Sequence, residues 1–248
     1  MCNFRGYEKS THLYDIFDDK ENIDFFKSYA EGVDKVLDVG AGTGRIAIPI
    51  WEEGKEVYCV EPSISMLDEI KKKRDENPDL CSKLNLIQDK AKDFIIDETF
   101  PLIIMSGVFD HLISDECRIC TLLNLNKHLM MGGTLVFDVG LGYMKEIENY
   151  KLSDVVKKDG LKEYKRYIKR EKKDENKLLI NLKYEIYEDG ELIETIEQPS
   201  EVGIIDKDKL EKLLKETGFG IKNEFGAYEN RPYKDGDSIC VIEAIKKE

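Results

Sequence analysis

The stretch "LDVGAGTGR", residues 37–45, places three glycines between the apolar run "KVLDV", which it overlaps, and the apolar run "IAIPI". Glycine loses more backbone freedom on folding than any other residue, so this density disfavours a helix or strand. The chain must therefore turn tightly here, and the missing side chains let a ligand come close to the backbone. A turn between a strand and a helix aims backbone N–H groups and the helix N-terminus at such a ligand. We therefore expect a binding site above this turn.

The spacing of the glycines separates classes of ligand. The dinucleotide-binding fingerprint is G-x-G-x-x-G, and its third glycine permits close packing of helix on strand. Here the glycines are Gly40, Gly42 and Gly44, and Arg45 stands where that third glycine would be. A pyrophosphate is therefore disfavoured, and an uncharged or cationic ligand fits as well. Asp38, at the end of the first strand, can meet a cationic group or, as the alternative, brace the loop.

The sequence on both sides of this turn predicts a parallel sheet. Near-continuous apolar runs, typical of strands buried on both faces, lie at 35–39, 56–60, 84–88, 101–106 and 134–140. Helical patterns stand between them, from Thr43 towards Glu53, from Ser63 onward, and from about Ser114 to Leu129. Alternating strands and helices predict an α/β fold, a doubly wound sheet with helices on both faces and right-handed crossovers.

The pattern changes after about residue 150. Apolar and polar residues then alternate over three stretches separated by short turn sequences, at 161–173, 176–188 and 191–203. Such alternation is typical of antiparallel strands joined by hairpins. A short amphipathic helix from Asp206 to Gly218 and a final pair of strands follow. We therefore expect three regions: N-terminal helices with the binding core (1–150), an antiparallel insertion (151–203), and a last helix with a hairpin completing the core sheet (204–248).

The composition limits the classes of binding partner that we expect. The chain has 248 residues, 51 of them acidic and 38 basic, with a net charge of −13. This field disfavours binding to nucleic acid. The N-terminus has no apolar leader and no apolar run approaches the ~20 residues that a membrane span needs, so we expect a cytoplasmic protein. Cys117 and Cys120 form a C-x-x-C without a second ligand pair, so we expect no metal.

Two further carboxylates follow strands of the predicted sheet. Glu61 comes directly after the second strand, roughly twenty residues beyond the glycines, where a carboxylate can accept both ribose hydroxyls of an adenosine-bearing cofactor. Asp89 follows the third strand, where it can meet an adenine amino group or serve as a turn residue. Together with the glycine turn, these residues predict a nucleoside-containing ligand.

These stretches resemble the class I S-adenosylmethionine-dependent methyltransferases over about residues 12–140. "VLDVGAGTGR" is similar to that superfamily's first motif, "VEPSISML" to its acidic post-motif, and "LIQDKAKDF" to its third-strand region. "IIMSGVFDHL" resembles the fourth motif and "HLMMGGTLVFDVG" the fifth strand. The later layout is similar to small-molecule methyltransferases with an antiparallel insertion after the fifth strand. The resemblance implies a Rossmann-like, mostly parallel sheet with an antiparallel last strand, and S-adenosylmethionine as cofactor, with S-adenosylhomocysteine as product.

The resemblance also implies a set of cofactor-binding residues. The glycine turn would lie by the methionine part, Glu61 on the ribose, Asp89 at the adenine, and Tyr14 over the cofactor. The full set is Tyr14, Asp38, Gly40, Ala41, Gly42, Thr43, Gly44, Glu61, Pro62, Met66, Asp89, Lys90, Ser106, Gly107 and Phe109. One departure is Pro101, since the family's fourth strand usually opens with an aspartate.

Methyl transfer from a sulfonium needs positioning more than acid–base chemistry, because the donor is already activated. An oxygen acceptor benefits from a base, and an amine must be neutral. Asp110 and His111, just past the fourth strand, are the catalytic candidates, although His111 can equally cap the next helix. For the acceptor we expect contacts from Tyr14, His111, Arg231 and Tyr233. Tyrosines of the insertion can roof the acceptor or simply pack: Tyr164, Tyr167, Tyr184 and Tyr187.

The function favoured by the sequence is methyl transfer from S-adenosylmethionine to a nitrogen or oxygen of a small molecule. The alternatives are an RNA or protein methyltransferase, a non-catalytic protein that binds the cofactor, and an NAD-dependent oxidoreductase. The acidic balance disfavours RNA, and Arg45 disfavours NAD. We expect a monomer or homodimer that does not bind membranes.

Overall fold

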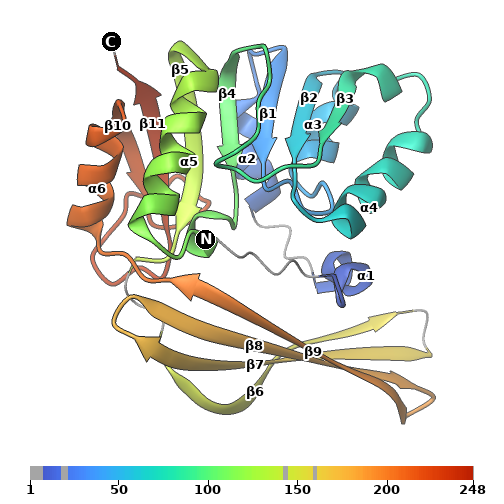
Figure 1. Cartoon of the computed structure of the whole chain (residues 1–248). Helices are drawn as coiled ribbons and strands as arrows, with labels where there is room; N and C mark the ends of the chain where they lie inside the picture. Colours follow the sequence, from blue (N-terminus) through green and yellow to red (C-terminus); the bar gives the residue numbers. More distant parts are fainter. Residues whose placement is uncertain (1–7, 18–21, 142–144, 159–160, 248) are drawn as a thin grey trace.

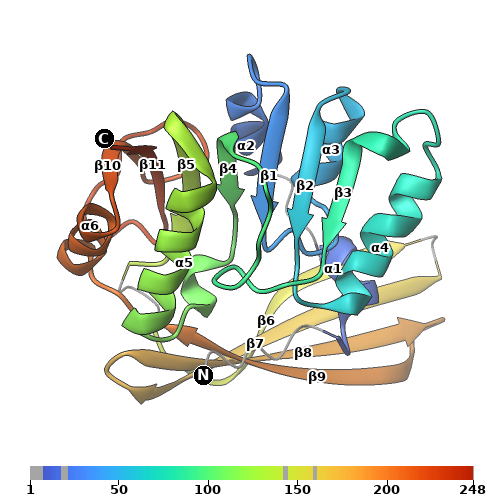
Figure 2. The same ribbon diagram turned by 45° about the horizontal axis from the view of Figure 1, so that its top comes forward.

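The protein consists of two sheets, one stacked across the end of the other. The computed structural model describes residues 8–17, 22–141, 145–158 and 161–247. A seven-stranded sheet with helices on both faces forms the core, and a four-stranded sheet lies beneath the ends of the core strands (Figure 1). The arrowheads of β1, β2 and β4 point towards the four-stranded sheet, so the carboxyl edge of the core faces it (Figures 1 and 2).

The core sheet has the order β10-β11-β5-β4-β1-β2-β3. Its strands are β1 (Lys35–Val39), β2 (Glu56–Val60), β3 (Leu84–Ile87), β4 (Phe100–Met105), β5 (Leu129–Val139), β10 (Phe219–Phe225) and β11 (Cys240–Lys246). β1 to β5 pair in parallel, and β11 runs antiparallel to β5 and β10, its two neighbours. The sequence-based prediction of a doubly wound, mostly parallel sheet with an antiparallel last strand is confirmed.

Apolar side chains on both faces of the core strands hold the helices in two layers. In β1, Leu37 and Val39 belong to the cluster under α5 and α6, whereas Val36 belongs to the cluster under α2, α3 and α4. This alternation follows from the two-residue period of a strand. The helices are α2 (Ile23–Tyr29), α3 (Ala47–Glu52), α4 (Ile64–Asp75), α5 (Asp115–His128) and α6 (Lys207–Glu216).

Side-chain caps fix where three of these helices begin. The oxygens of Ser63, Ser114 and Asp206 accept hydrogen bonds from backbone N–H groups three residues on, satisfying donors that the first turn leaves free. The predicted helix start at Thr43 is wrong, because α3 begins at Ala47. The positive φ of 87° at Gly44 keeps the chain in a turn beyond Thr43.

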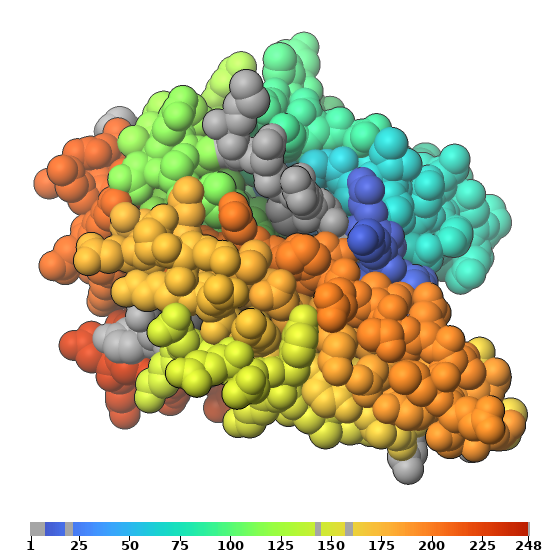
Figure 3. Space-filling view, turned by 60° about the horizontal axis from the view of Figure 1, so that its bottom comes forward, coloured from blue at the N-terminus to red at the C-terminus, as the bar shows by residue number. Residues whose placement is uncertain are grey.

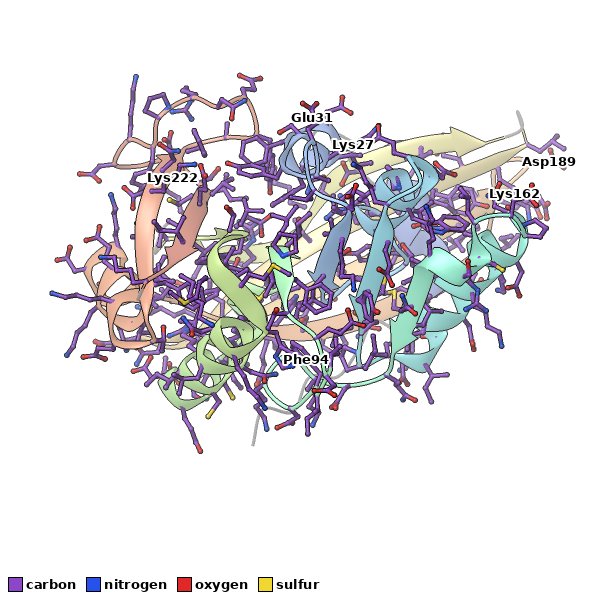
Figure 4. All side chains as sticks on the ribbon, turned by 90° about the horizontal axis from the view of Figure 1, so that it is seen from above. Lys27, Glu31, Phe94, Lys162, Asp189 and Lys222 are labelled. Atoms are coloured by element: carbon purple, nitrogen blue, oxygen red, sulfur yellow. The ribbon has the colours of Figure 1, made fainter. Side chains whose placement is uncertain are left out.

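The four-stranded sheet is antiparallel, in the order β6-β7-β8-β9. Its strands are β6 (Ile147–Lys158), β7 (Lys162–Asp174), β8 (Lys177–Glu188) and β9 (Glu191–Gly203). Figure 3 looks onto its outer face. In Figure 4, Lys162 and Asp189 mark one end of this sheet, and Figure 1 shows it running beneath the core.

The sequence did not predict β6, and it did not show which tyrosines of this sheet face the core. β6 carries mostly polar residues, and only its pairing with β7 makes it a strand. Tyr184 faces the core and packs on Phe17, whereas Tyr167 and Tyr187 lie beside lysines on the other face. Half of the alternating tyrosines must point outward, so they cannot together roof a pocket.

A short N-terminal segment sits between the two sheets. It contains α1 (Thr11–Tyr14) and the 3-10 helix η1 (Asp15–Phe17), and Figures 1 and 2 both place α1 between the core and the four-stranded sheet. Leu13 and Phe17 are buried against Tyr184, Ile186 and Ile196 of the sheet. The segment is thus packed on the sheet at the point where it reaches the core.

Candidate functional site

A cavity opens at the carboxyl edge of the core sheet, where α/β proteins bind ligands. It spans about 850 Å³ of space, part of it open solvent. Ten of the predicted site residues line it: Tyr14, Gly40, Gly42, Glu61, Pro62, Met66, Lys90, Ser106, Gly107 and His111. Five lining residues were not predicted: Ala91, Lys92, Val108, Leu112 and Thr121. We call this space the donor cavity.

The glycines of the turn have two different roles. All three have positive φ, which favours glycine. A Cβ on Gly42 would meet only Tyr14, 4.0 Å away, so its missing side chain leaves space in the donor cavity. A Cβ on Gly40 would lie 2.2 Å from Val108, and one on Gly44 2.8 Å from Ile48. Gly44 therefore allows packing, and Gly42 allows a ligand to approach.

Glu61 stands over the turn as a buried carboxylate, with 5% of its surface exposed. Its two oxygens accept hydrogen bonds from the backbone N–H of Gly42, at 3.0 Å, and of Ser63, at 2.9 Å. Burial raises the pKa of Glu61, and these two bonds oppose the rise. Each carboxylate oxygen retains acceptor capacity, so Glu61 can take the hydroxyl groups of a ligand.

Asp38 lies beneath the turn and does not line the cavity. It is 2% exposed, and its Oδ2 has no hydrogen-bond partner among the residues that the structure describes. Burial raises its pKa to about 7, partly offset by the positive charge of Arg45. A buried carboxylate oxygen without a partner is uncommon, and a cationic ligand group would stabilise its charged form.

The N-terminal segment covers the glycine turn from the other side. Asp15 accepts hydrogen bonds from the Thr43 hydroxyl and from Lys73, the latter at 2.7 Å. Lys73 also donates to the Thr43 carbonyl, at 2.8 Å. Thr43 therefore fixes the segment rather than contacting the cavity, while Tyr14 lines the cavity opposite Gly42.

Some of the other predicted cofactor-binding residues line the donor cavity, and others do not. Pro62 and Met66 give the cavity an apolar wall, and Lys90 lines it near Ala91. Asp89 does not line it: its carboxylate accepts from the backbone N–H of Lys90, at 2.7 Å. Two further predicted residues lie behind the wall, since Ala41 is 7% exposed in the core and Phe109 is buried and stacked on Phe137.

The two catalytic candidates point to different sides of η4 (Phe109–His111). His111 lines the donor cavity, bonds to the backbone of Glu201, and has Nδ1 3.5 Å from the Ser200 hydroxyl. Burial lowers the pKa of His111. Asp110 faces a second cavity, accepts from the backbone N–H of Gly140 at 3.1 Å, and has its pKa raised to about 7 by burial. His111 thus links η4 to β9, and the carboxylate of Asp110 can accept a proton near neutral pH.

A polar network between the two cavities was not predicted. Asp138, at the end of β5, accepts from the Ser106 hydroxyl at 3.0 Å, the backbone N–H of Gly107 at 2.6 Å and the Tyr228 hydroxyl at 2.9 Å. Asn22 donates to Ser106 at 3.2 Å. An aspartate inside the apolar run "TLVFDVG" was the available signal, since a buried carboxylate needs partners.

The predicted acceptor contacts Arg231 and Tyr233 have partners elsewhere. Arg231 forms a two-bond ion pair with Asp237, at 2.9 and 3.0 Å, and donates to the Gly226 carbonyl at 2.8 Å. Lys207 lies 5.0 Å from the centre of the Tyr233 ring, which packs against the core. Arg231 therefore shapes the loop between β10 and β11, and its charge is already neutralised.

The described residues form neither a cluster placed to hold a metal ion nor a helix that could span a membrane. No group of three or more His, Cys, Asp or Glu side chains in it is placed to hold a metal ion. Cys117 is disulfide-bonded and Cys120 is a free, exposed thiol, so the C-x-x-C is not a two-thiol pair. None of the described helices has both the length and the apolar character of a membrane span.

Comparison with known proteins agrees with this geometry. Residues 37–135 match the family described as "Methyltransferase domain". The cypemycin N-terminal methyltransferase of Streptomyces sp is 32% identical over 104 residues, 42% of this chain and 40% of that protein. The chain thus aligns with less than half the length of this relative.

Two solved structures share the fold over nearly the whole chain. An S-adenosylmethionine-dependent methyltransferase from Clostridium acetobutylicum superposes with a TM-score of 0.81 at 21% identity, covering 98% of this chain and 99% of that one. The sugar N-methyltransferase KedS8 from Streptoalloteichus superposes with a TM-score of 0.73 at 15% identity, covering 99% and 94%. Residues 37–135 thus match a methyltransferase domain, and the chain as a whole shares its fold with S-adenosylmethionine-dependent methyltransferases.

Proposed function

We propose that the protein transfers a methyl group from S-adenosylmethionine to a nitrogen or oxygen atom of a small-molecule acceptor. The observation that supports this most directly is the donor cavity. In it a glycine-rich turn, the buried Glu61 and an apolar wall meet at the carboxyl edge of the sheet. The named activities of the relatives support the same chemistry.

The residues present fit this cofactor. The methionine part of the cofactor would lie in the open space at Gly42 and Gly107, because a Cβ at either glycine would project into the cavity. Glu61 would accept the ribose hydroxyls, and Pro62 and Met66 would flank the adenosine. Asp38 would offset the positive charge of the methionine amino group through its unpartnered oxygen. When bound, the cofactor supplies an activated methyl group on a sulfonium.

We assign the proton acceptor to Asp110 rather than His111. Asp110 has a pKa of about 7 and is held by the Gly140 N–H, so it can keep an amine neutral or accept a hydroxyl proton near physiological pH. His111 is already tied to Glu201 and placed close to Ser200. We assign it the role of holding the four-stranded sheet over the donor cavity.

The most direct test of this proposal is a measurement of cofactor binding. Titration calorimetry should show S-adenosylmethionine and S-adenosylhomocysteine binding to the protein, and NAD not binding. A protein stabilised by NAD alone would overturn the proposal, because ligand binding to the folded state raises its stability.

Turnover then separates the classes of acceptor. Transfer of labelled methyl groups should occur with pools of small amines and alcohols and not with tRNA or peptides. Transfer only to tRNA or peptides would overturn the small-molecule assignment, and cofactor binding without any transfer would favour a non-catalytic binding protein. The regions 1–150, 151–203 and 204–248, the cytoplasmic location and the monomeric or dimeric state belong to the same proposal. Limited proteolysis, cell fractionation and sedimentation test them.

A further inference from the structure

A second cavity lies on the far side of η4 from the donor cavity. Its wall comes from η4, the end of β5, the inner face of β7 and the loop between β10 and β11. Its polar side chains are Asp110, Arg170, Tyr228, Glu229, Arg231 and Ser238. We call this space the acceptor cavity.

Arg170 reaches this cavity from the face of β7 that looks at the core. Successive residues of a strand alternate between faces, so Arg170 shares a face with Arg166, four positions earlier. Arg166 lies 5.1 Å from the centre of the Phe17 ring of the N-terminal segment, which fixes that face as the inner one. The pairing of β7 with β8 runs without a shift from Arg166 to Arg170, so the alternation is unbroken.

The guanidinium of Arg170 is left without a partner for its Nε. That atom is buried and makes no hydrogen bond in the described part of the chain. Burial lowers the pKa of Arg170. Arg170 is only half-buried, but its Nε is fully buried and lacks an acceptor. An anion in the cavity would supply both a counter-charge and the missing acceptor.

Two other arginines show what a satisfied guanidinium looks like in the same region. Arg231, on the opposite wall, is paired with Asp237 through two bonds. Arg166, on the same strand, is paired with Asp154 at 2.6 Å. Arg170 differs from both because no ion pair to it is formed by the described residues. It is therefore the cationic group in the cavity that remains available to a ligand.

The two cavities adjoin at one hydrogen-bonded network. Ser106 and Gly107 line the donor cavity and donate to Asp138, and Asp138 accepts from Tyr228, which lines the acceptor cavity. Asp110 and His111 are neighbours in η4 and line one cavity each. A molecule in the acceptor cavity therefore lies next to the proton acceptor and to the groups beside the donor.

We propose that the acceptor cavity binds the methyl acceptor, and that Arg170 pairs with an anionic group of that acceptor, a carboxylate or a phosphate. The proposal rests on the proposed methyl transfer for the identity of the ligand, but the anion site itself does not. Planar guanidinium and these oxyanions match through two parallel hydrogen bonds. The acceptor is therefore a small acidic molecule, such as an amino acid or a phosphorylated amine.

The anion site can be tested without activity. In ¹⁵N-labelled protein, the Nε–H resonance of Arg170, assigned by its loss in Arg170→Lys, should shift in a saturable way with inorganic phosphate or acetate. Chloride at equal ionic strength should not shift it, and the resonances of Arg166 and Arg231 should stay in place. The stronger of the two anions identifies the group. No saturable shift, or equal shifts at all three arginines, would overturn the site.

Turnover tests the link to methyl transfer. Acceptor amines are compared in pairs that differ only in a carboxylate or a phosphate. Arg170→Met should raise KM for the acidic member about 10–100-fold, the usual range for a charged hydrogen bond, and leave kcat and the neutral member within threefold. Arg166→Met is the matched control and should change neither.

Equal losses for the acidic and neutral members would overturn the role of Arg170. If the protein binds no S-adenosylmethionine, the proposed function fails while the resonance titration still decides the anion site. The two failures are therefore distinguishable.

Discussion

The donor and acceptor cavities draw their walls from different parts of the chain. Of the residues lining the donor cavity, Tyr14 alone lies outside residues 37–135, the stretch that matches the methyltransferase domain. Of those lining the acceptor cavity, Asp110 alone lies inside it. The part of the chain that matches the methyltransferase domain thus lines most of the donor cavity, and the segments that follow it line most of the acceptor cavity.

The polar groups of the two cavities also differ in their partners. Glu61 is held by backbone N–H groups from the turn and from the start of α4, whereas the Nε of Arg170 is unpartnered in the described structure. A donor site fixed by backbone geometry suits one cofactor. An acceptor site made from side chains of a sheet and a loop can change specificity through single substitutions without disturbing the donor site.

The largest expected effect is at Asp110, the one residue that joins the two halves of this comparison. Asp110→Asn should lower kcat about 10²–10⁴-fold, the usual contribution of a general base, while cofactor affinity stays within twofold. Because only the ionised carboxylate accepts a proton and burial raises its pKa to about 7, the wild-type rate should rise with pH through about 7. The variant should lack this rise.

His111→Gln is the control for that experiment. It keeps a hydrogen-bonding side chain beside Ser200 but removes the imidazole. A loss of kcat in His111→Gln with none in Asp110→Asn would move the base to the donor side of η4.

The next effect concerns the turn itself. Gly42→Val should weaken S-adenosylhomocysteine binding about 100-fold or more, since a β-branched residue at φ 56° is strained and its side chain enters the donor cavity. Gly32→Val carries the same kind of strain at φ 83°, away from the cavity, and should bind normally. Calorimetry with circular dichroism checks both affinity and folding. Normal binding by a folded Gly42→Val protein would place the cofactor elsewhere.

Glu61→Ala should have a smaller effect on the donor side. It removes a charged acceptor and frees the Gly42 and Ser63 N–H groups, so cofactor affinity should fall by about 1–3 kcal/mol. Glu61→Gln keeps one oxygen and should lose less. Unchanged affinity of Glu61→Ala in calorimetry would contradict the ribose assignment.

The smallest effect is the pH dependence of cofactor binding through Asp38. Burial holds its pKa at about 7 in the free protein, and a cationic group beside it should lower that pKa on binding. Ionised Asp38 then binds more tightly, so affinity should rise up to about tenfold between pH 6 and pH 8. Asp38→Asn should flatten this slope. A slope unchanged in the variant would assign it to another group.

The sequence predicted the core because its signals are local. The apolar runs of β1 and β2 and the helix starts at Ser63 and Ser114 each depend on a few consecutive residues, and all four are where the pattern placed them. β6 was missed because its strand character comes from pairing with β7. The start of α3 was misplaced because Gly44 serves the packing of Ile48 rather than the helix.

The donor side of the candidate site followed from motifs, and the acceptor side did not. Glu61 lies at a fixed interval from the glycines, so its position could be inferred from spacing. Arg170 and Tyr228 meet only because the four-stranded sheet and the β10–β11 loop converge on η4. Arg231 looked equally available in the sequence, and only the structure shows that Asp237 neutralises it.

The N-terminal segment links the two sites mechanically. Asp15 bonds to the glycine turn through Thr43, and Phe17, two residues on, packs on Tyr184 of the four-stranded sheet. A shift of the four-stranded sheet would therefore be passed through this segment to the glycine turn. This gives the two ligands a contiguous route for cooperative binding, in which occupancy of either site alters the affinity of the other by the same factor.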